Sequence, residues 1–379
     1  MFKKAGKKLL CAALALALFW GVGAYTVKTV QFIHSIIQMG NEELFRSGER
    51  AMEFFQEAED AGAELAQKVS ARQMNILFTG IDDALGGSDV IMVASLDLDA
   101  GNIRIVQIPR DTFINRPGSE NHKINTVYAT AATKAKAQGQ SANEAAHTAN
   151  RALRVFLQTN MGIPIDHYVS VDTKGLRAIV DAVGGVTVNV PMDIDYDDQS
   201  QNLHIHLKKG KQKLDGAKAE QFVRFRSGYL TADYGRMDAQ KIFLSAMLHK
   251  IKTDFSLPNA INLATTCLSH VKSDLSAADL IPLIRGALQI SEENVKMITL
   301  KGQGAKDERG VLCEVLSRSY AIDLLTEYLL PRGGKSTDLK FDPNGVFTAP
   351  GEIDRIYRST APYDRSGVSA NESDKIKPR

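Results

Sequence analysis

Three arginines stand close together in the stretch QFVRFRSGYLTADYGRMDAQ. Arg224 and Arg226 alternate with apolar residues, which predicts that both project from one face of a short strand. Asp233 suits the N-cap of a following helix, so Arg236 and Gln240 would lie one turn apart near its positive end. Because like charges at this spacing repel, a multiply charged anion such as a phosphate is the expected occupant. A solvated edge strand with two long basic side chains is the alternative.

Carboxylates form a second charged group. Three short apolar runs predict neighbouring buried strands, at residues 75–80, 89–96 and 103–108. Asp82 follows the first run, Asp89 opens the second, and Arg110 and Asp111 close the third. Carboxylates gathered at strand ends repel each other unless a cation lies between them, and oxygen ligands suit Mg²⁺. Asp82 and Asp89 are therefore candidate magnesium ligands, with separate surface loops as the alternative.

Three other patterns resemble metal sites only loosely. His204 and His206 alternate along a predicted strand, but no third ligand of their type is near, which favours a polar strand face. The Asp-rich residues 193–201 lack the Gly and closing Glu of a calcium-binding EF-hand loop, which favours a solvated loop. The spacing of Cys267 and Cys313 does not support metal binding, and either a disulfide or two buried thiols would be consistent with it.

The overall composition argues against one broad class of partner. The chain has 379 residues, 44% of them hydrophobic, and a formal net charge of +2, which suits one large or two small globular domains. A chain this close to neutrality has no general polyanion-binding surface, so nucleic acid is not an expected partner.

The N-terminus predicts a membrane anchor. A lysine-rich segment, residues 1–8, precedes an uncharged apolar run at residues 9–27, which as a helix would be about 28 Å long and would span a bilayer. The positive-inside rule keeps residues 1–8 in the cytoplasm and places the rest of the chain outside it. The run exceeds the usual hydrophobic segment of a signal peptide, which favours an uncleaved signal anchor over a cleaved peptide.

The remaining chain divides by its pattern. Residues 28–73 predict a helical stalk or a first helix packed on the domain, residues 74–330 a globular domain, and residues 331–379 a disordered tail. Helices are expected at residues 123–137, 141–160, 173–182, 217–221, 257–268, 276–290 and 319–330, and further strands at 163–171, 187–190, 203–207 and 295–300. The order strand, helix, strand at 163–190 predicts a βαβ crossover, and residues 302–310 predict a flexible loop.

The motifs NIL…GID, SDVIM, IPRDT, KIN, VDAVGGV and VRFR…DYGR occur in this order between residues 75 and 236. Together they resemble the LytR-CpsA-Psr family across roughly residues 74–252, with weaker similarity to about residue 330. Each motif alone is weak, whereas six in order are specific. The elements and the resemblance predict an α/β fold: a three-layer α-β-α arrangement with a central mixed sheet, after an N-terminal transmembrane helix.

The resemblance implies a membrane-anchored, extracytoplasmic phosphotransferase that moves a glycopolymer from a polyprenyl pyrophosphate carrier to peptidoglycan. Carried over by position, Asp82 and Asp89 would hold Mg²⁺, and Asp111 would orient Arg110 or assist the incoming hydroxyl. The residues expected to bind the pyrophosphate are Arg110, Lys123, Arg224, Arg226, Arg236 and Gln240. The Ala-rich helices at 123–137 and 141–160 would enclose the lipid.

Two positions depart from the family pattern. Gly87 and Ala239 stand where the family usually has arginine, and losing two cations should weaken charge stabilisation of a pyrophosphate. A divergent but active transferase is the favoured interpretation. A non-catalytic polyprenyl-phosphate-binding scaffold and a pyrophosphatase are the alternatives. A transcription regulator is disfavoured because no helix-turn-helix pattern is evident.

Overall fold

The computed structural model describes the chain mainly between residues 73 and 339. The described ranges are 73–82, 86–114, 122–199, 203–226, 233–253, 289–306, 310–316 and 318–339, with shorter pieces between 229 and 287 and at 368–369. The expected anchor and stalk and the helix at 257–268 lie wholly or mostly outside them. Among the described helices none is both long enough and apolar enough to cross a membrane.

The chain divides into two compact units. The smaller unit comprises residues 1–73, 97–102 and 275–290. In it, Gly286 packs so closely on Leu98 that an added Cβ would lie 2.7 Å from the leucine Cδ1. The larger unit comprises residues 74–96, 103–274 and 291–379 and contains every residue expected to take part in the chemistry.

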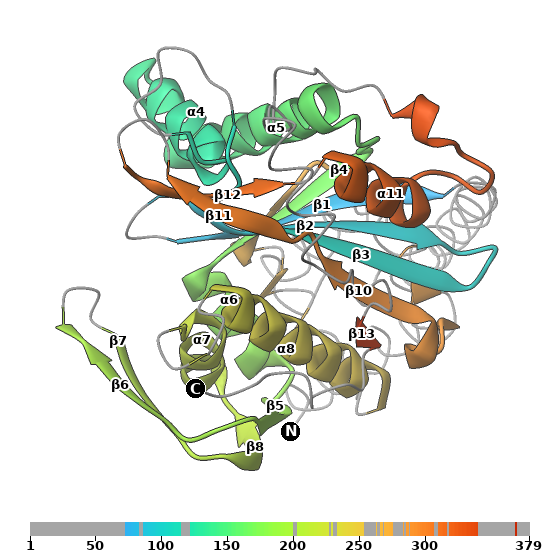
Figure 1. Cartoon of the computed structure of the whole chain (residues 1–379). Coiled ribbons are helices and arrows are strands. Elements are labelled where there is room, and N and C mark those ends of the chain that lie inside the picture. The colour runs from blue at the N-terminus through green and yellow to red at the C-terminus, as the bar shows by residue number, and fades with distance from the viewer. Residues whose placement is uncertain are drawn as a thin grey trace, which may run out of the picture. The chain divides into compact units, whose positions relative to one another are not determined.

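A mixed sheet forms the centre of the larger unit (Figure 1), in the order β10-β3-β2-β1-β4-β9. Its strands are β1 (Met74–Ile81), β2 (Ser88–Asp97), β3 (Asn102–Ile108), β4 (His167–Asp172), β9 (Val271–Ser273) and β10 (Val295–Thr299), and the short β13 (Val368–Ser369) adds to β10. Strand β1 runs antiparallel to β2 and parallel to β4, and β3 runs parallel to β10. Five of these strands, namely β1, β2, β3, β4 and β10, confirm strands expected from the sequence, whereas β9 was not expected.

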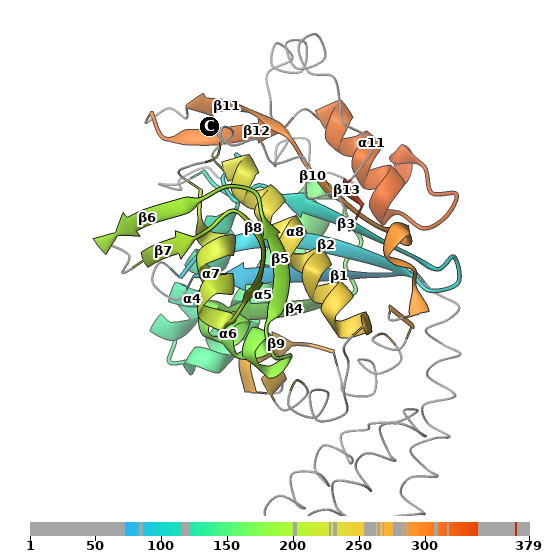
Figure 2. The same cartoon turned by 90° about the horizontal axis from the view of Figure 1, so that it is seen from below.

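Helices flank this sheet (Figures 1 and 2). They are α4 (Asn125–Ala137), α5 (Ala142–Met161), α6 (Thr173–Ala182), α7 (Gly216–Arg224), α8 (Asp233–Thr253) and α11 (Arg318–Leu329). Helix α5 begins with the expected capping box, in which the Ser141 hydroxyl accepts from the amide of Glu144 and the Glu144 carboxylate accepts from the amide of Ser141. The domain is a mixed α/β fold whose strand ends carry the charged residues.

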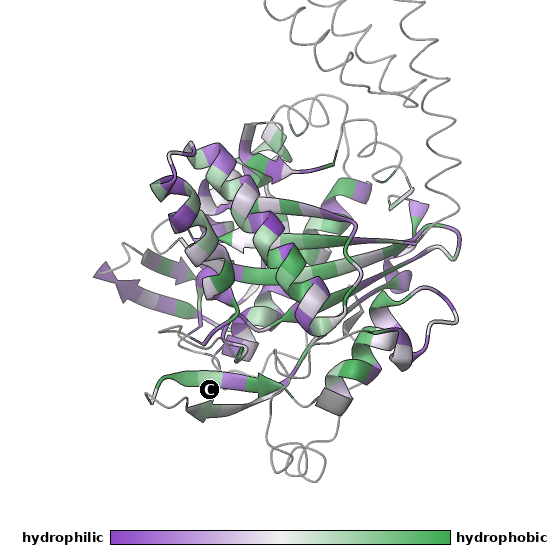
Figure 3. Cartoon of the chain, turned by 90° about the horizontal axis from the view of Figure 1, so that it is seen from above, coloured by the Kyte–Doolittle hydropathy of each residue, from purple (hydrophilic) through white to green (hydrophobic). Residues whose placement is uncertain are grey.

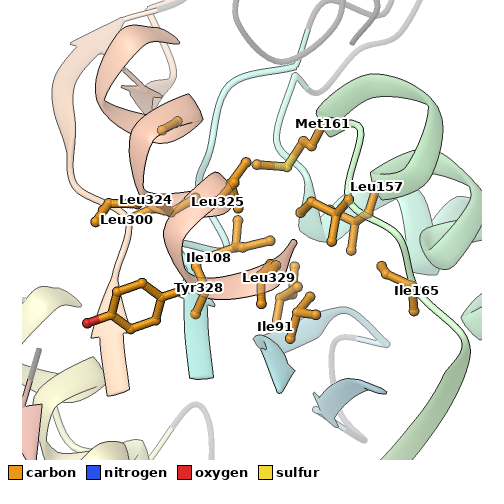
Figure 4. Close-up of a cluster of buried hydrophobic side chains, with 14 of the residues drawn as sticks. Ile91, Ile108, Leu157, Met161, Ile165, Leu300, Leu324, Leu325, Tyr328 and Leu329 are labelled. Carbon is orange, nitrogen blue, oxygen red and sulfur yellow. The ribbon is translucent and has the colours of Figure 1, made fainter. Parts of the chain in front are cut away.

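One apolar core joins the sheet to α5 and α11 (Figure 4). Ile91 and Ile108 of the sheet pack with Leu157 of α5 and with Leu325 of α11. The same core includes Leu339, which follows the 3₁₀-helix η5 (Ser336–Asp338). Apolar packing therefore continues past residue 330, where the sequence predicted the tail to begin. Figure 3 shows that hydrophobic residues concentrate along the strands of the sheet.

A second apolar core lies among α6, α7, α8 and two small antiparallel sheets. These sheets pair β5 (Val186–Val190) with β8 (Gly210–Leu214), and β6 (Ile194–Asp198) with β7 (Leu203–Leu207). Because β5 joins β8 instead of the central sheet, the predicted βαβ crossover is wrong. The turn after α6 redirects the chain, with Gly184 and Gly185 at φ of 76° and 85°.

Two expected loops contain strands. The Asp-rich residues 193–201 include β6, where Asp195 and Asp197 pair across to His206 and His204. Residues 302–310 include β11 (Gly302–Lys306), which pairs with β12 (Leu312–Leu316). In both cases cross-strand hydrogen bonds decide the structure of a segment whose polar or Gly-rich composition predicted a loop.

The two cysteines of the described residues are free thiols. Cys313 is buried on β12, and burial raises the pKa of the Cys267 thiol. No disulfide links them.

Candidate active site

The turn between β1 and β2 holds the two candidate metal ligands. Asp82 follows β1, Asp89 lies at the start of β2, and the antiparallel pairing brings both to one edge of the sheet. The Asp82 amide donates to the Gly87 carbonyl oxygen (3.1 Å), and the Gly86 amide donates to the Asp82 carbonyl oxygen (2.8 Å). Asp82 is only 6% exposed. The pairing of β1 with β2 therefore places Asp82 and Asp89 at the same end of the sheet, as the sequence predicted.

Arg110 lies at the end of β3 beside Asp89. Its Nη1 donates to Asp89 Oδ1 at 2.7 Å, and its Nε lies 4.0 Å from Asp233 Oδ1. Burial acts to lower the pKa of Arg110, but Asp89, Asp233 and Asp111 outweigh it and the net effect raises the pKa. The guanidinium is therefore a fixed cation held among carboxylates.

Arg236 approaches the same carboxylates from the first turn of α8. Its Nη2 contacts Asp233 Oδ1 at 2.7 Å and its Nη1 lies 3.9 Å from Asp89 Oδ2. Arg236 is 4% exposed, and this burial lowers its pKa, an effect that Asp233 and Asp89 oppose. The helix begins at Asp233, as expected from the sequence.

Within the part of the chain that the structure describes, two buried donors of this cluster have no hydrogen-bond partner. They are the Nε atoms of Arg110 and Arg236. An unsatisfied buried N–H group costs about 1–3 kcal/mol, and each guanidinium carries a full charge besides. An anion with several oxygens would satisfy both donors.

The predicted strand at Arg224 and Arg226 is wrong. Arg224 is the last residue of helix α7, which begins after Asp215, whose side chain accepts from the amide of Lys218. The Nη1 of Arg224 contacts Glu220 Oε1 at 2.9 Å, one helical turn earlier. Glu220 and Arg224 are spaced i, i+4, which favours a helix, although the alternation of QFVRF favours a strand.

The two arginines of this stretch nevertheless both approach the cluster. The Nη2 of Arg224 lies 3.7 Å from Asp82 Oδ2. Arg226 is exposed, beyond the end of α7, and its charge is close enough to help lower the pKa of Arg236. The end of α7 and the start of α8 thus bring further arginines to Asp82 and Asp89, more than 100 residues after Arg110 in the chain.

Gln240 and Lys123 occupy different surroundings. Gln240 is buried, accepts from Gln107 Nε2 at 2.7 Å and donates to the Val223 carbonyl oxygen at 3.2 Å. These bonds tie α8 to β3 and α7, which suits a supporting role. Lys123 Nζ contacts Asp111 Oδ1 at 3.1 Å. Asp111 therefore forms its ion pair with Lys123, whereas the sequence suggested that it orients Arg110.

The chemistry of the cluster favours an anion held together with a cation. The carboxylates that pair with Arg110, Lys123, Arg224 and Arg236 are at least as numerous as these cations, namely Asp82, Asp89, Asp111, Asp233 and Glu220. Arg226 and Arg177, which pairs with Glu220, add positive charge, so the carboxylates offset most of the charge of the basic side chains and leave little with which to attract a pyrophosphate. No group of three metal-ligating side chains lies together in the described ranges, but Mg²⁺ in proteins often uses one or two carboxylates plus substrate phosphates.

Sequence reasoning missed three carboxylates near the site. Asp233 was expected only to cap a helix, and Glu220 and Glu314 were not considered. Glu220 had a signal in its i, i+4 spacing to Arg224. Glu314 stands alone in the apolar run VLCEVL, and a single charge in such a run is the signal that could have indicated it.

The departure at Gly87 has room for a larger side chain. Among the described residues, a Cβ added at Gly87 would meet Asn125 Nδ2 alone, at 3.9 Å. We expect Gly87→Arg to fold normally and to lower the KM for a pyrophosphate-linked donor about tenfold, since one charge-assisted hydrogen bond contributes about 1.5–3 kcal/mol. Steady-state transfer kinetics measure this. Gly87→Ser, which removes the glycine without adding charge, is the matched control and should leave KM unchanged.

Comparison with known proteins places this site in context. The sequence profile of the LytR_cpsA_psr family matches residues 45–322. The polyisoprenyl-teichoic acid–peptidoglycan teichoic acid transferase TagV of Bacillus subtilis is 26% identical over 307 residues, which cover 78% of this chain and 70% of TagV. TagU of Bacillus mycoides, with the same transferase description, is 29% identical over 257 residues, which cover 66% of this chain and 76% of TagU.

Solved structures support the fold. The crystal structure of B. subtilis TagV has a TM-score of 0.54 at 24% identity, covering 69% of this chain and 99% of that one. A structure of TagT bound to LIIa-WTA has a TM-score of 0.50 at 21% identity, covering 70% and 91%. At these identities the likeness establishes the shared fold.

Proposed function

Because the chain belongs to the LytR-CpsA-Psr family, we propose that it is a phosphotransferase that moves a glycopolymer of the teichoic acid class from a polyprenyl pyrophosphate carrier to peptidoglycan. Its relatives TagV and TagU are described as polyisoprenyl-teichoic acid–peptidoglycan teichoic acid transferases. Teichoic acid is therefore the favoured polymer, and a sugar hydroxyl of peptidoglycan the favoured acceptor.

One observation carries the proposal most strongly. Arg110 from the end of β3 and Arg236 from the start of α8 meet at Asp89 and Asp233, and each has a buried Nε donor that makes no hydrogen bond to the described residues. Proteins rarely leave buried charged donors unsatisfied. A pyrophosphate offers oxygens to both arginines and explains why two guanidinium groups are held so close together.

Phosphoryl transfer from a pyrophosphate to a hydroxyl group requires little covalent help from the protein. The acceptor hydroxyl oxygen forms a bond to the phosphorus that carries the glycopolymer, and the bond from this phosphorus to the bridging oxygen breaks. Polyprenyl phosphate leaves with the additional negative charge. Arg110 and Arg236 would stabilise the charge that develops, while Arg224, Arg226 and Lys123 would add to the positive field. Gln240 would support the arrangement through Gln107.

Magnesium fits the residues present. Asp82 and Asp89 lie at the two ends of one turn, and two carboxylates together with phosphate oxygens and water form a usual Mg²⁺ ligand set. When bound, the ion would neutralise phosphate charge. Asp89 would then share its oxygens between the ion and the arginines.

Chelation tests the metal. We expect EDTA to abolish transfer and added Mg²⁺ to restore it, because carboxylates already offset most of the charge of the arginines. Asp82→Asn should raise the Mg²⁺ concentration for half-maximal rate about tenfold or more, as expected from the loss of one charged ligand. Asp195→Asn, which alters an exposed aspartate of β6 that pairs with His206, is the matched control and should leave that concentration unchanged. Full activity in EDTA would rule out the metal.

The proposed location follows from the substrates and the N-terminus. Residues 9–27 would anchor the chain in the cell membrane with the catalytic domain extracytoplasmic, where peptidoglycan and the lipid carrier meet. The Ala-rich helices α4 and α5 remain the proposed walls for the lipid.

The decisive experiment follows polymer from carrier to acceptor. Full-length protein in detergent or vesicles is mixed with a polyprenyl pyrophosphate-linked glycopolymer, peptidoglycan and Mg²⁺, and the products are separated by size and by lipid content. Polymer attached to peptidoglycan, with release of polyprenyl phosphate, supports the transferase. Binding without turnover selects the scaffold, and hydrolysis that peptidoglycan does not redirect selects a pyrophosphatase.

A further inference from the structure

The β11–β12 hairpin is attached directly to the segment that carries Arg110. The Phe113 amide donates to the Glu314 carbonyl oxygen at 2.7 Å, and the Glu314 amide donates to the Asp111 carbonyl oxygen at 2.8 Å. Thr112 and Glu314 form a parallel bridge. Glu314 therefore lies about one strand spacing, roughly 4.8 Å, from the backbone that follows Arg110.

Hydrogen bonds fix the Glu314 carboxylate. The Tyr234 hydroxyl donates to Glu314 Oε2 at 3.2 Å and accepts from the Gly302 amide at 2.8 Å. The phenol donates its single proton to the carboxylate. The hydrogen bonds therefore run in one direction, from the Gly302 amide through the Tyr234 hydroxyl to Glu314. A Cβ at Gly302 would lie 3.1 Å from Glu314 Oε2, so the glycine leaves space for the carboxylate.

The surroundings of Glu314 suit a group that exchanges a proton. Burial raises the pKa of Glu314, the hydrogen bond from Tyr234 lowers it, and the negative charges of Asp111 and Asp233 raise it further. Asp111 is engaged by Lys123, and Asp233 by Arg236. Among the described residues, the Glu314 carboxylate contacts a neutral hydroxyl, whereas the carboxylates of Asp111 and Asp233 contact cations.

We propose that Glu314 is the catalytic base that accepts the proton of the acceptor hydroxyl. The inference rests on the proposed function. As the hydroxyl oxygen bonds to phosphorus, its proton moves to a Glu314 carboxylate oxygen. The phosphorus–bridging-oxygen bond breaks, and polyprenyl phosphate leaves with that electron pair. The proton is later released to solvent, which returns Glu314 to its ionised form.

This assignment differs from the role expected for Asp111. The Lys123 ammonium contacts Asp111 Oδ1 at 3.1 Å, so this carboxylate is already engaged by a cation. Glu314 lies beside it on the neighbouring strand, and burial raises the pKa of its carboxyl group, which makes the carboxylate a stronger base. Asp111 and Lys123 then act together as a positioning pair.

The first test removes the ionisable group while preserving shape. Glu314→Gln should lower kcat for transfer about 10²-fold or more, the range of general base catalysis, with binding of the lipid donor unchanged. Glu327→Gln is the matched control, because Glu327 is exposed on α11 of the same unit, and it should transfer at the wild-type rate. A Glu314→Gln variant with wild-type kcat would overturn the proposal.

The second test reads the pH profile, which a purely structural role would not move. The base must be ionised, so wild-type kcat should rise with pH as Glu314 loses its proton. Tyr234→Phe removes the hydrogen bond that lowers the Glu314 pKa, so this acidic limb should move to higher pH. Residual transfer by Glu314→Gln should lack the limb. Identical limbs in wild type and Tyr234→Phe would count against Glu314.

The two proposals fail in different ways. If wild-type protein binds the lipid but transfers nothing in the presence of Mg²⁺, the proposed function fails and the base has no reaction to serve. If wild type transfers while Glu314→Gln keeps the same rate and pH profile, the transferase stands and the base lies elsewhere. Should Glu314→Gln fold poorly by thermal melting, Tyr234→Phe alone decides through its pH profile.

Discussion

Replacing Arg110 by alanine is expected to lower transfer about 10²–10³-fold, the cost of removing one preorganised donor from a site of developing negative charge. Arg110 contacts Asp89 at 2.7 Å and keeps a buried Nε donor, so its loss removes charge at the centre of the cluster. Asp89 retains Arg236 at 3.9 Å, and the domain should therefore still fold. Transfer kinetics together with thermal melting measure both effects.

Two further variants sharpen this prediction. Arg110→Lys keeps the charge but loses the planar fork that suits phosphate, so it should recover only part of the activity. Arg151→Ala removes an exposed arginine of α5 and should change neither rate nor stability. Wild-type transfer by a folded Arg110→Ala protein would contradict the assignment of this cluster as the active site.

Ala239→Arg is expected to destabilise the domain by about 3–5 kcal/mol, the usual cost of an unpaired buried charge. Ala239 is fully buried, in the apolar core that includes Phe222, Phe225 and Phe243. The added guanidinium would lose its water without gaining a carboxylate partner there, and its volume would also displace the aromatic rings. Denaturant unfolding monitored by circular dichroism measures the loss.

The exposed Ala217 of α7 provides the matched control. Ala217→Arg adds the same side chain to the same unit and should leave the unfolding free energy within about 0.5 kcal/mol. If Ala239→Arg were as stable as wild type and more active, this position would belong to the site, as it does in the usual family pattern. The unfolding measurement therefore tests whether position 239 belongs to the apolar core or to the anion-binding site.

The two departures from the family pattern have different structural meanings. Gly87 borders open space beside the site, where an arginine can be added. Ala239 faces the second apolar core, where an arginine cannot be accommodated without cost. From the sequence alone both positions read as missing cations of equal weight.

Elements with strong local signals could be predicted from the amino-acid sequence. The apolar runs became β1, β2 and β3, the capping box at Ser141 began α5, and the motif order identified the family. Asp82, Asp89 and Arg110 could be placed at one edge of a sheet because strand ends follow from the same apolar periodicity. The physical reason is that these signals depend on residues only a few positions apart.

The remaining contacts of the site depend on long-range packing. Arg224 ends a helix because Glu220 lies one turn away, although the alternation of QFVRF predicted a strand. Asp111 pairs with Lys123, and Glu314 reaches the same segment from β12, more than 200 residues farther along the chain. Such partners meet through long-range pairing of strands, which local periodicity does not encode. The sequence therefore identified the arginines together with Asp82 and Asp89. The fold brought the further carboxylates Glu220, Asp233 and Glu314 to the site.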